Sequence, residues 1–181
     1  TPDAPGAPAD LLLIAVKSTA LPAIFPDIAP FVSDTTQILP LLNGITAQDT
    51  LAAAFGWPHV LYGFVYCSSS MRTGNAVIQN GVNKIVFGEP TNTPPSPRVQ
   101  AIANFFSQLG IAHDTPPDMR AAQWKKFILN IGINQAQAIL RAPCRELQEN
   151  PEAMQLARTL MDEAAAIATA IGIPNADQLP A

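Results

Sequence analysis

The pattern of apolar positions begins with two segments typical of buried strands. A continuous apolar run occurs at 11–16, with the sequence LLLIAV, and the segment 33–42, SDTTQILPLL, contains a second one, which predicts a strand at 36–41. Runs of this length indicate strands that are buried on both faces, as in a parallel sheet. The residues between them include apolar side chains at helical spacing, namely Leu21, Ile24, Ile28 and Phe31. Strand, helix and strand over this distance predict a βαβ crossover, and Pro40 indicates that the second strand is short or lies at a sheet edge.

The middle of the chain adds further strands and one short helix. Segments 59–67, 76–80 and 84–89 contain many β-branched and aromatic residues, which favour strands. The letters QNGVNK join the last two segments, and their Asn-Gly pair predicts a hairpin turn there. A short helix is predicted at 47–55, where Gly56 ends it.

The last third of the chain shows helical patterns alone. An amphipathic helix is predicted at 98–110, and no strand pattern follows residue 117. A long helix is predicted at 118–141, and Asn150-Pro151 has the residues that cap and start another one at 151–171. The chain therefore reads as part of an α/β domain followed by an all-helical segment.

The helix around WKKFILNIGINQAQAILR, residues 124–141, has an unusual interior. It contains Asn130, Gly132 and Asn134, although Asn costs several tenths of a kcal/mol relative to Ala in a helix and Gly costs about 1 kcal/mol. Lys126, Asn130 and Asn134 are spaced i, i+4 and i+8, so they follow one flank that drifts by about 40° per step. Burying an ammonium and two amides without partners would be costly. A polar cleft that faces a ligand with several oxygens would satisfy them, and the alternative is a flank that faces solvent.

Polar residues also follow the first two predicted strands. Lys17 comes directly after LLLIAV, and Asn43-Gly44 comes directly after ILPLL. Ligands of open parallel sheets bind beyond the carboxyl ends of the strands, where neighbouring strand ends form one crevice. Lys17 would offer a cation there and Asn43 an amide. The alternative is that Lys17 is a solvated loop residue and that Asn43-Gly44 is simply a turn.

Composition limits the classes of function. The 181 residues are 48% hydrophobic and carry ten basic and fourteen acidic side chains, for a net charge of −4. Without a basic block, this balance argues against a nucleic-acid surface. No apolar run reaches the roughly 18 residues that a membrane span needs. Cys67 and Cys144 do not have a C-x-x-C spacing, and His59 and His113 are isolated, so no metal site is expected and a reducing cytoplasm is the simpler location.

Four segments, in this order, give the chain a resemblance to ketopantoate reductase, also called 2-dehydropantoate 2-reductase. They are DLLLIAVK, LPLLNG, YCSSSMRTG with VFGE, and AAQWKKFILNIGINQAQAILR. The last segment is similar to a W-[RK]-K-x-x-x-N-x-x-x-N helix that opens the family's second domain. The resemblance implies a partial Rossmann-like parallel sheet at 1–115. It also implies that 116–181 is the first part of a helical domain resembling the 6-phosphogluconate dehydrogenase C-terminal-like domain.

The resemblance also implies an activity, the NADPH-dependent reduction of ketopantoate to pantoate in pantothenate and coenzyme A biosynthesis. Lys126 would be the catalytic lysine, and Lys126, Asn130 and Asn134 would bind the 2-keto acid. The cofactor would be held by residues near the strand ends, namely Lys17, Asn43 and Ser70. The partner is then a small molecule, with neither nucleic acid nor membrane involved and with a homodimer left open.

The sequence also departs from the family pattern. The family begins with a G-x-G-x-x-G turn that cradles pyrophosphate, and nothing similar is present in this chain. Cys144 stands where the family has another substrate-binding Asn, and the family's later Ser and Glu would follow residue 181. We therefore expect an internal fragment whose isolated activity is in doubt. A reductase of another 2-keto acid, with NADPH or NADH, and a non-catalytic remnant are the alternatives.

Overall fold

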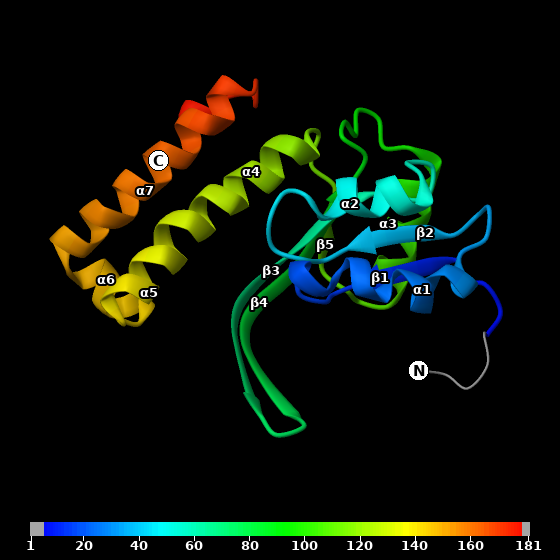
Figure 1. Cartoon of the computed structure of the whole chain (residues 1–181), viewed down its shortest axis with the longest axis horizontal. Coiled ribbons are helices and arrows are strands. Elements are labelled where there is room, and N and C mark those ends of the chain that lie inside the picture. The colour runs from blue at the N-terminus through cyan, green and yellow to red at the C-terminus, as the bar shows by residue number, and fades with distance from the viewer. Residues whose placement is uncertain (1–5, 179–181) are drawn as a thin grey trace. The chain divides into compact units, whose positions relative to one another are not determined.

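The protein is described by a computed structural model that covers residues 6–178, apart from six side chains: Ser68, Ser69, Ser70, Asn80, Val82 and Asp177. Two compact units divide between Met119 and Arg120. The first unit is mixed α/β with parallel strands, and the second is helical (Figure 1). This architecture confirms the predicted fold class.

Strands β1 (Leu11–Ile14) and β2 (Gln37–Pro40) pair in parallel, with Leu11 opposite Gln37 and Ile14 opposite Pro40. The parallel pairing was predicted, although each strand is shorter than its apolar run. The connection between them is not one helix. It consists of 3₁₀ turns at 18–20, 22–24 and 29–31 around the four-residue helix α1 (Phe25–Ile28). Prolines fall at the start of three of these pieces, where a missing N–H is tolerated, and they prevent one continuous helical hydrogen-bond ladder.

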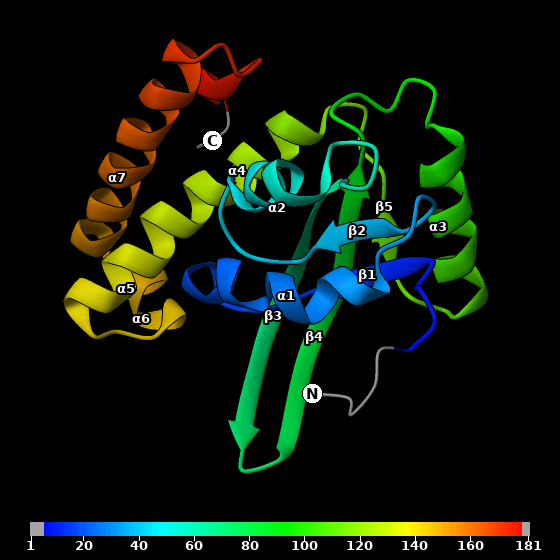
Figure 2. The same ribbon diagram turned by 45° about the vertical axis from the view of Figure 1, so that its right-hand side comes forward.

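The sheet continues beyond β2 through a parallel bridge between Ile38 and Val60. Two backbone bonds support this bridge: the Ile38 amide donates to the His59 carbonyl (2.6 Å), and the Leu61 amide donates to the Ile38 carbonyl (3.1 Å). Strand β3 (Tyr62–Thr73) then pairs antiparallel with β4 (Ala76–Gly88), and β4 pairs in parallel with β5 (His113–Asp114). Strands β3 and β4 form a long hairpin (Figures 1 and 2).

The hairpin turn was predicted at QNGVNK, and that interpretation is wrong. The turn lies at residues 74–75, where Gly74 has a φ of 58°. Gly81 lies inside β4 with a φ of 87°, beside the register shift between Cys67 and Ser69. Two residues of β4 there face one residue of β3, which is a β-bulge that uses a glycine in the left-handed region. The Asn-Gly pair therefore makes a bulge, and the three segments predicted at 59–67, 76–80 and 84–89 form only two strands.

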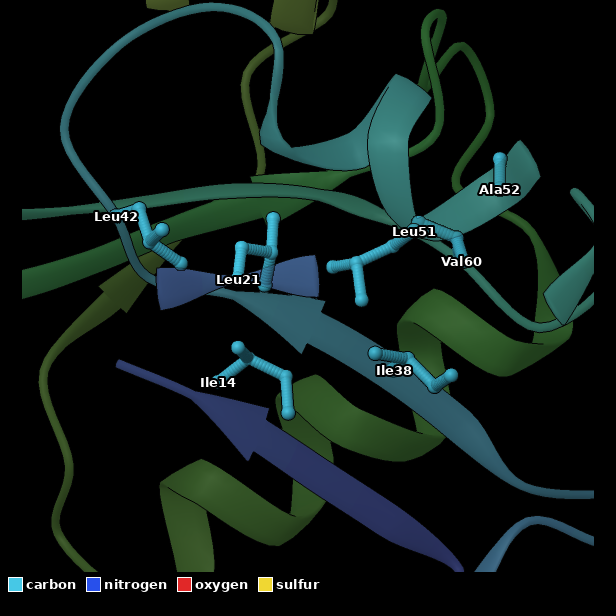
Figure 3. Packing of buried hydrophobic residues seen from close by; sticks show 7 residues of the cluster. All are labelled: Ile14, Leu21, Ile38, Leu42, Leu51, Ala52 and Val60. Carbon is cyan, nitrogen blue, oxygen red and sulfur yellow. The ribbon is translucent and has the colours of Figure 1, made fainter. Parts of the chain in front are cut away.

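Both faces of β2 are buried, as its apolar run indicated. Ile38 belongs to a cluster that includes residues of β1 and of helix α2 (Ala47–Phe55), and Figure 3 shows its members. Leu39, the next residue, belongs to a second cluster, which includes residues of helix α3 (Pro97–Gln108) and of β4. Figure 2 shows α3 beside the sheet. Leu13 of β1 is 48% exposed, so β1 is less covered than its sequence suggested.

The second unit contains a long interrupted helix followed by two more. Helix α4 (Met119–Leu129) leads into a π-helical segment (Asn130–Asn134) and then into α5 (Gln135–Leu140). Helix α6 (Cys144–Glu149) was not predicted, whereas α7 (Pro151–Ala170) matches the helix expected at 151–171. A short 3₁₀ turn (Ala176–Gln178) follows. Within the described residues the chain has no strand after residue 120 and no helix long and apolar enough to span a membrane.

Candidate functional site

Lys17 and Asn43 line the same pocket at the carboxyl ends of β1 and β2. The pocket has a volume of about 340 Å³, and the neighbouring residues of both strand ends complete its wall: Ala15, Val16, Ser18, Leu41 and Leu42. The structure therefore brings these two predicted site residues together. It also adds Ser18, which the sequence did not single out because a serine in a loop carries no distinctive signal.

Local backbone geometry explains why these side chains are presented at the pocket. Lys17 is extended, with φ and ψ of −68° and 143°, and the chain enters a 3₁₀ turn immediately after it. The Lys17 carbonyl accepts a hydrogen bond from the Ala20 amide at 2.9 Å, which closes this turn. After β2, the chain bends at residues 43–45, and Gly44 has a φ of 104°, a conformation that favours glycine. Lys17 and Asn43 are both exposed, so a ligand can reach them.

This pocket combines a cation, an amide and a hydroxyl with apolar wall residues. Such a mixture suits a ligand that has both a flat apolar ring and hydroxyl or phosphate oxygens. Its volume lies at the lower end of the range for ligand pockets, roughly 300–1,000 Å³. The pocket therefore suits a small ligand, or one part of a larger one, better than a whole large ligand.

The second group of predicted site residues lies on one helix of the second unit. Lys126 belongs to α4, and Asn130 and Asn134 are the first and last residues of the π-helical segment. Lys126 and Asn130 are partly buried, and Asn134 is exposed. The continuous α-helix predicted at 118–141 is thus interrupted at the residues that made its interior unusual. A π-turn of this kind occurs frequently at functional sites.

Gly132, in the middle of the π-turn, has a packing role of its own. A Cβ atom at this position would lie 2.7 Å from the Ala157 carbonyl oxygen and 2.6 Å from Met161 Cε, and it would also meet Met161 Cγ. The Met161 side chain and the Ala157 backbone of α7 therefore leave room only for a hydrogen atom. The presence of glycine in this helix follows from the close approach of α7.

The remaining candidates fall outside these two groups. Ser70 lies in β3 and pairs with Gln79, but its side chain lies outside the described part of the structure. Cys144 is exposed and begins α6. Nδ1 of His59 lies 3.0 Å from the Thr36 carbonyl oxygen, and Nδ1 of His113 lies 2.9 Å from that of Ile111. Both histidines therefore contact backbone, in agreement with a structural role. Among residues 6–178, no three side chains of the metal-binding types are grouped closely enough to hold a metal ion.

Comparison with protein families gives two matches that follow one another along the chain. The family model described as Ketopantoate reductase PanE/ApbA matches residues 1–92, and the model of its C-terminal part matches residues 118–180. A 2-dehydropantoate 2-reductase from Nostoc sp. is 26% identical over 170 residues, which cover 90% of this chain and 52% of the relative. An uncharacterized oxidoreductase from Bacillus subtilis, YkpB, is 25% identical and is matched over 91% of this chain and 54% of its own length. The chain thus spans about half the length of the curated relatives it matches.

Solved structures show the same similarity. A 2-dehydropantoate 2-reductase from Geobacter metallireducens superposes with a TM-score of 0.84 at 30% identity, over 96% of this chain and 60% of that one. A D-mandelate dehydrogenase, solved with NADH and anilino(oxo)acetate, superposes with a TM-score of 0.85 over 99% of this chain and 57% of that one. The mandelate dehydrogenase is 18% identical, so its likeness concerns the fold alone.

Proposed function

Because the chain belongs to the ketopantoate reductase family, we propose that its protein is an NADPH-dependent reductase that converts 2-dehydropantoate to pantoate. The observation that carries this proposal is the row formed by Lys126, Asn130 and Asn134 on one helix. The similarity to 2-dehydropantoate 2-reductases supports the same reaction. With this activity, the protein would act in pantothenate biosynthesis in the cytoplasm.

The pocket at the ends of β1 and β2 is the proposed site for part of the cofactor. Bound NADPH would supply the hydride for the reduction. Lys17 would contact cofactor oxygens through its ammonium group, and Asn43 would hydrogen-bond through its amide. Ser70 is assigned to the cofactor by the family resemblance alone.

Lys126 is the proposed catalytic residue. Its ammonium group would donate a hydrogen bond to the ketone oxygen and then a proton to the alkoxide that forms. Positive charge at the position where oxyanion charge develops stabilises the transition state more than the ground state. A lysine at this place therefore raises the rate of the reaction, beyond any contribution it makes to binding.

Asn130 and Asn134 are the proposed substrate-binding residues. Each side-chain amide has two N–H donors and one acceptor oxygen. This combination suits a 2-keto acid that carries both a carboxylate and a hydroxyl group. Since these substrate groups do not change charge in the reaction, the asparagines would contribute mainly to binding.

A reductase of a different 2-keto acid is the second candidate. Cys144 motivates it, because this exposed residue stands at the position of a substrate-binding Asn in the family resemblance. A thiol is a poorer hydrogen-bond partner than an amide, so the preferred side chain of the substrate would differ. Use of NADH as the cofactor and assembly as a homodimer are two further proposals.

A substrate and cofactor panel tests the function directly. In the full-length protein, kcat/KM would be measured for ketopantoate and for straight-chain, branched and aromatic 2-keto acids, each with NADPH and NADH. We expect the highest value with ketopantoate and NADPH. A higher value with another 2-keto acid would favour the second candidate, and a purified, folded protein that reduces none of them would reject the reductase function.

A further inference from the structure

Gly132 lies on the face of the interrupted helix that packs on α7. Ile128, Gly132 and Ala136 follow one another at intervals of four residues, and all three are buried. Ala136 belongs to a core cluster with Ala153 and Ala157. Gly132 and Ala136 therefore face α7, and Ile128 continues the same row of buried residues one turn earlier.

The proposed substrate-binding row lies on the other side of this helix. Lys126, Asn130 and Asn134 are each displaced by two residues from Ile128, Gly132 and Ala136. Two residues correspond to about 200° around an α-helix, so the two rows face in opposite directions. A change in the backbone at Gly132 would therefore move side chains of the polar row, without any contact between the two rows.

The π-turn affects how the polar row is aligned. In a regular α-helix, residues four apart drift by about 40° per step, so Asn134 would drift by about 80° from Lys126. A π-turn closes its hydrogen bonds between residues five apart and so winds fewer degrees per residue. The turn from Asn130 to Asn134 consequently reduces the drift and brings Asn134 back toward the line through Lys126 and Asn130.

We propose that Gly132 is a positioning residue for the substrate and that it acts through Asn134; this proposal rests on the proposed function. The widened backbone of the turn fits against α7 because Gly132 has no side chain. A methyl group there would meet the backbone carbonyl of Ala157, which cannot move aside as a flexible side chain can. If the turn yields, it rewinds as an α-helix and rotates Asn134 away from Lys126, while Asn130, at the start of the turn, keeps its place.

Double-mutant cycles in the full-length protein separate this role from a general loss of stability. We expect Gly132→Ala to raise KM for ketopantoate roughly tenfold, the loss of about one hydrogen bond to a charged group, with the Kd for NADPH unchanged. In an Asn134→Ala background the same substitution should raise KM less than twofold, because the contact is already lost. In an Asn130→Ala background the full tenfold effect should remain.

Two controls complete the cycles. Leu147→Val removes a methylene from the same core, in which Leu147 is fully buried, so it should lower Tm and leave KM unchanged. If the Gly132→Ala variant does not fold, the double variant Gly132→Ala with Met161→Ala is measured instead. The second substitution removes the clashes with Met161, whereas the clash with the Ala157 carbonyl remains. The raised KM should then persist. Equal effects of Gly132→Ala in both asparagine backgrounds, or a lower Tm without a change in KM, would overturn the proposal.

A crystal structure of the Gly132→Ala variant tests the proposal without any measurement of activity. The expected result is an α-helical turn at residues 130–134 with Asn134 rotated relative to Lys126. A retained π-turn, with α7 displaced instead, would overturn the positioning role. A wild-type protein that reduces no 2-keto acid would reject the proposed function. The crystal structure of the variant would still show whether Gly132 sets the position of Asn134.

Discussion

Arg98 connects four parts of the first unit through one guanidinium group. Its Nε donates to Glu89 Oε1 at 2.6 Å and its Nη2 to Glu89 Oε2 at 2.6 Å, after the end of β4. Its Nη1 donates to Gln37 Oε1 at 3.1 Å, at the start of β2, and to the carbonyl of Pro58. A two-pronged pair of this kind fixes geometry as well as charge. Arg98 therefore ties the first turn of α3 to the sheet.

The pair predicts a pH dependence of stability. The hydrogen bond from Arg98 is the largest cause of a lowered pKa of Glu89, relative to its ordinary value of 4.5, and it outweighs the opposing effect of burial. A lowered pKa in the folded state stabilises the fold above the unfolded-state pKa, and this stabilisation is lost as pH falls through the folded-state value. Glu89→Gln should therefore lower the free energy of unfolding by about 1–3 kcal/mol at pH 7, and the difference should shrink below pH 4.5.

Urea denaturation at several pH values measures this difference. Asp114→Asn is the matched control, because it removes the exposed Lys84–Asp114 pair, whose N–O distance is 3.2 Å. Exposed pairs are worth about 0–1 kcal/mol, so this variant should differ little from wild type. A Glu89→Gln difference that stays constant from pH 7 to pH 3 would contradict the assignment.

The proposed cofactor pocket gives a further prediction about single residues. Lys17→Ala and Asn43→Ala should each weaken NADPH binding, roughly tenfold, because each removes one polar contact. The melting temperature should change little, since both side chains are exposed. Fluorescence titration with NADPH gives the Kd, and Lys84→Ala, at the exposed salt bridge, serves as the control. Unchanged Kd values for both pocket variants would place the cofactor elsewhere.

Among the helices and strands, the sequence correctly predicted those features that a single residue determines. Asn150 caps α7 as expected: its side chain accepts hydrogen bonds from the amides of Glu152 and Ala153 at 3.0 and 3.1 Å. Gly56 ends α2 with a φ of 86°. The prediction of the hairpin turn failed because both Gly74 and Gly81 could form it. Which glycine does so depends on the register of the two strands. Strand β5, of two residues, is too short to leave a pattern.

The Asn150 cap gives a direct test at this scale. Asn150→Ala should lower the free energy of unfolding by about 1 kcal/mol, since two amides at the start of α7 lose their acceptor. Asn104→Ala is the matched control, because Asn104 lies exposed inside α3, where alanine is the better helix former. Thermal denaturation should show a lower Tm for the first variant and an equal or higher Tm for the second. Equal Tm values for both variants would show that the cap is not needed.

At the scale of the whole molecule, the fold class and the family followed from the order of the segments. The parallel strands, the helical second unit and the residues of the polar row were all visible in the sequence. The π-turn was not visible, and neither was the close approach of α7, which reaches Gly132 from about 25 residues further along the chain. The sequence showed that a helix contains an unfavourable glycine. It did not show the contact with α7 that explains the glycine.

Lys126 is the proposed proton donor for reduction of a 2-keto acid, and the kinetics of Lys126→Ala test this role. Steady-state rates with ketopantoate and NADPH would be measured in the full-length protein, with Lys125→Ala, the exposed neighbouring lysine, as the control. Loss of one such electrostatic donor costs about 100- to 1,000-fold in rate, roughly 3–4 kcal/mol. We expect a fall of this size in kcat for Lys126→Ala, an unchanged Kd for NADPH, and near-normal kinetics for Lys125→Ala. Near-normal turnover by Lys126→Ala would show that Lys126 is not the proton donor.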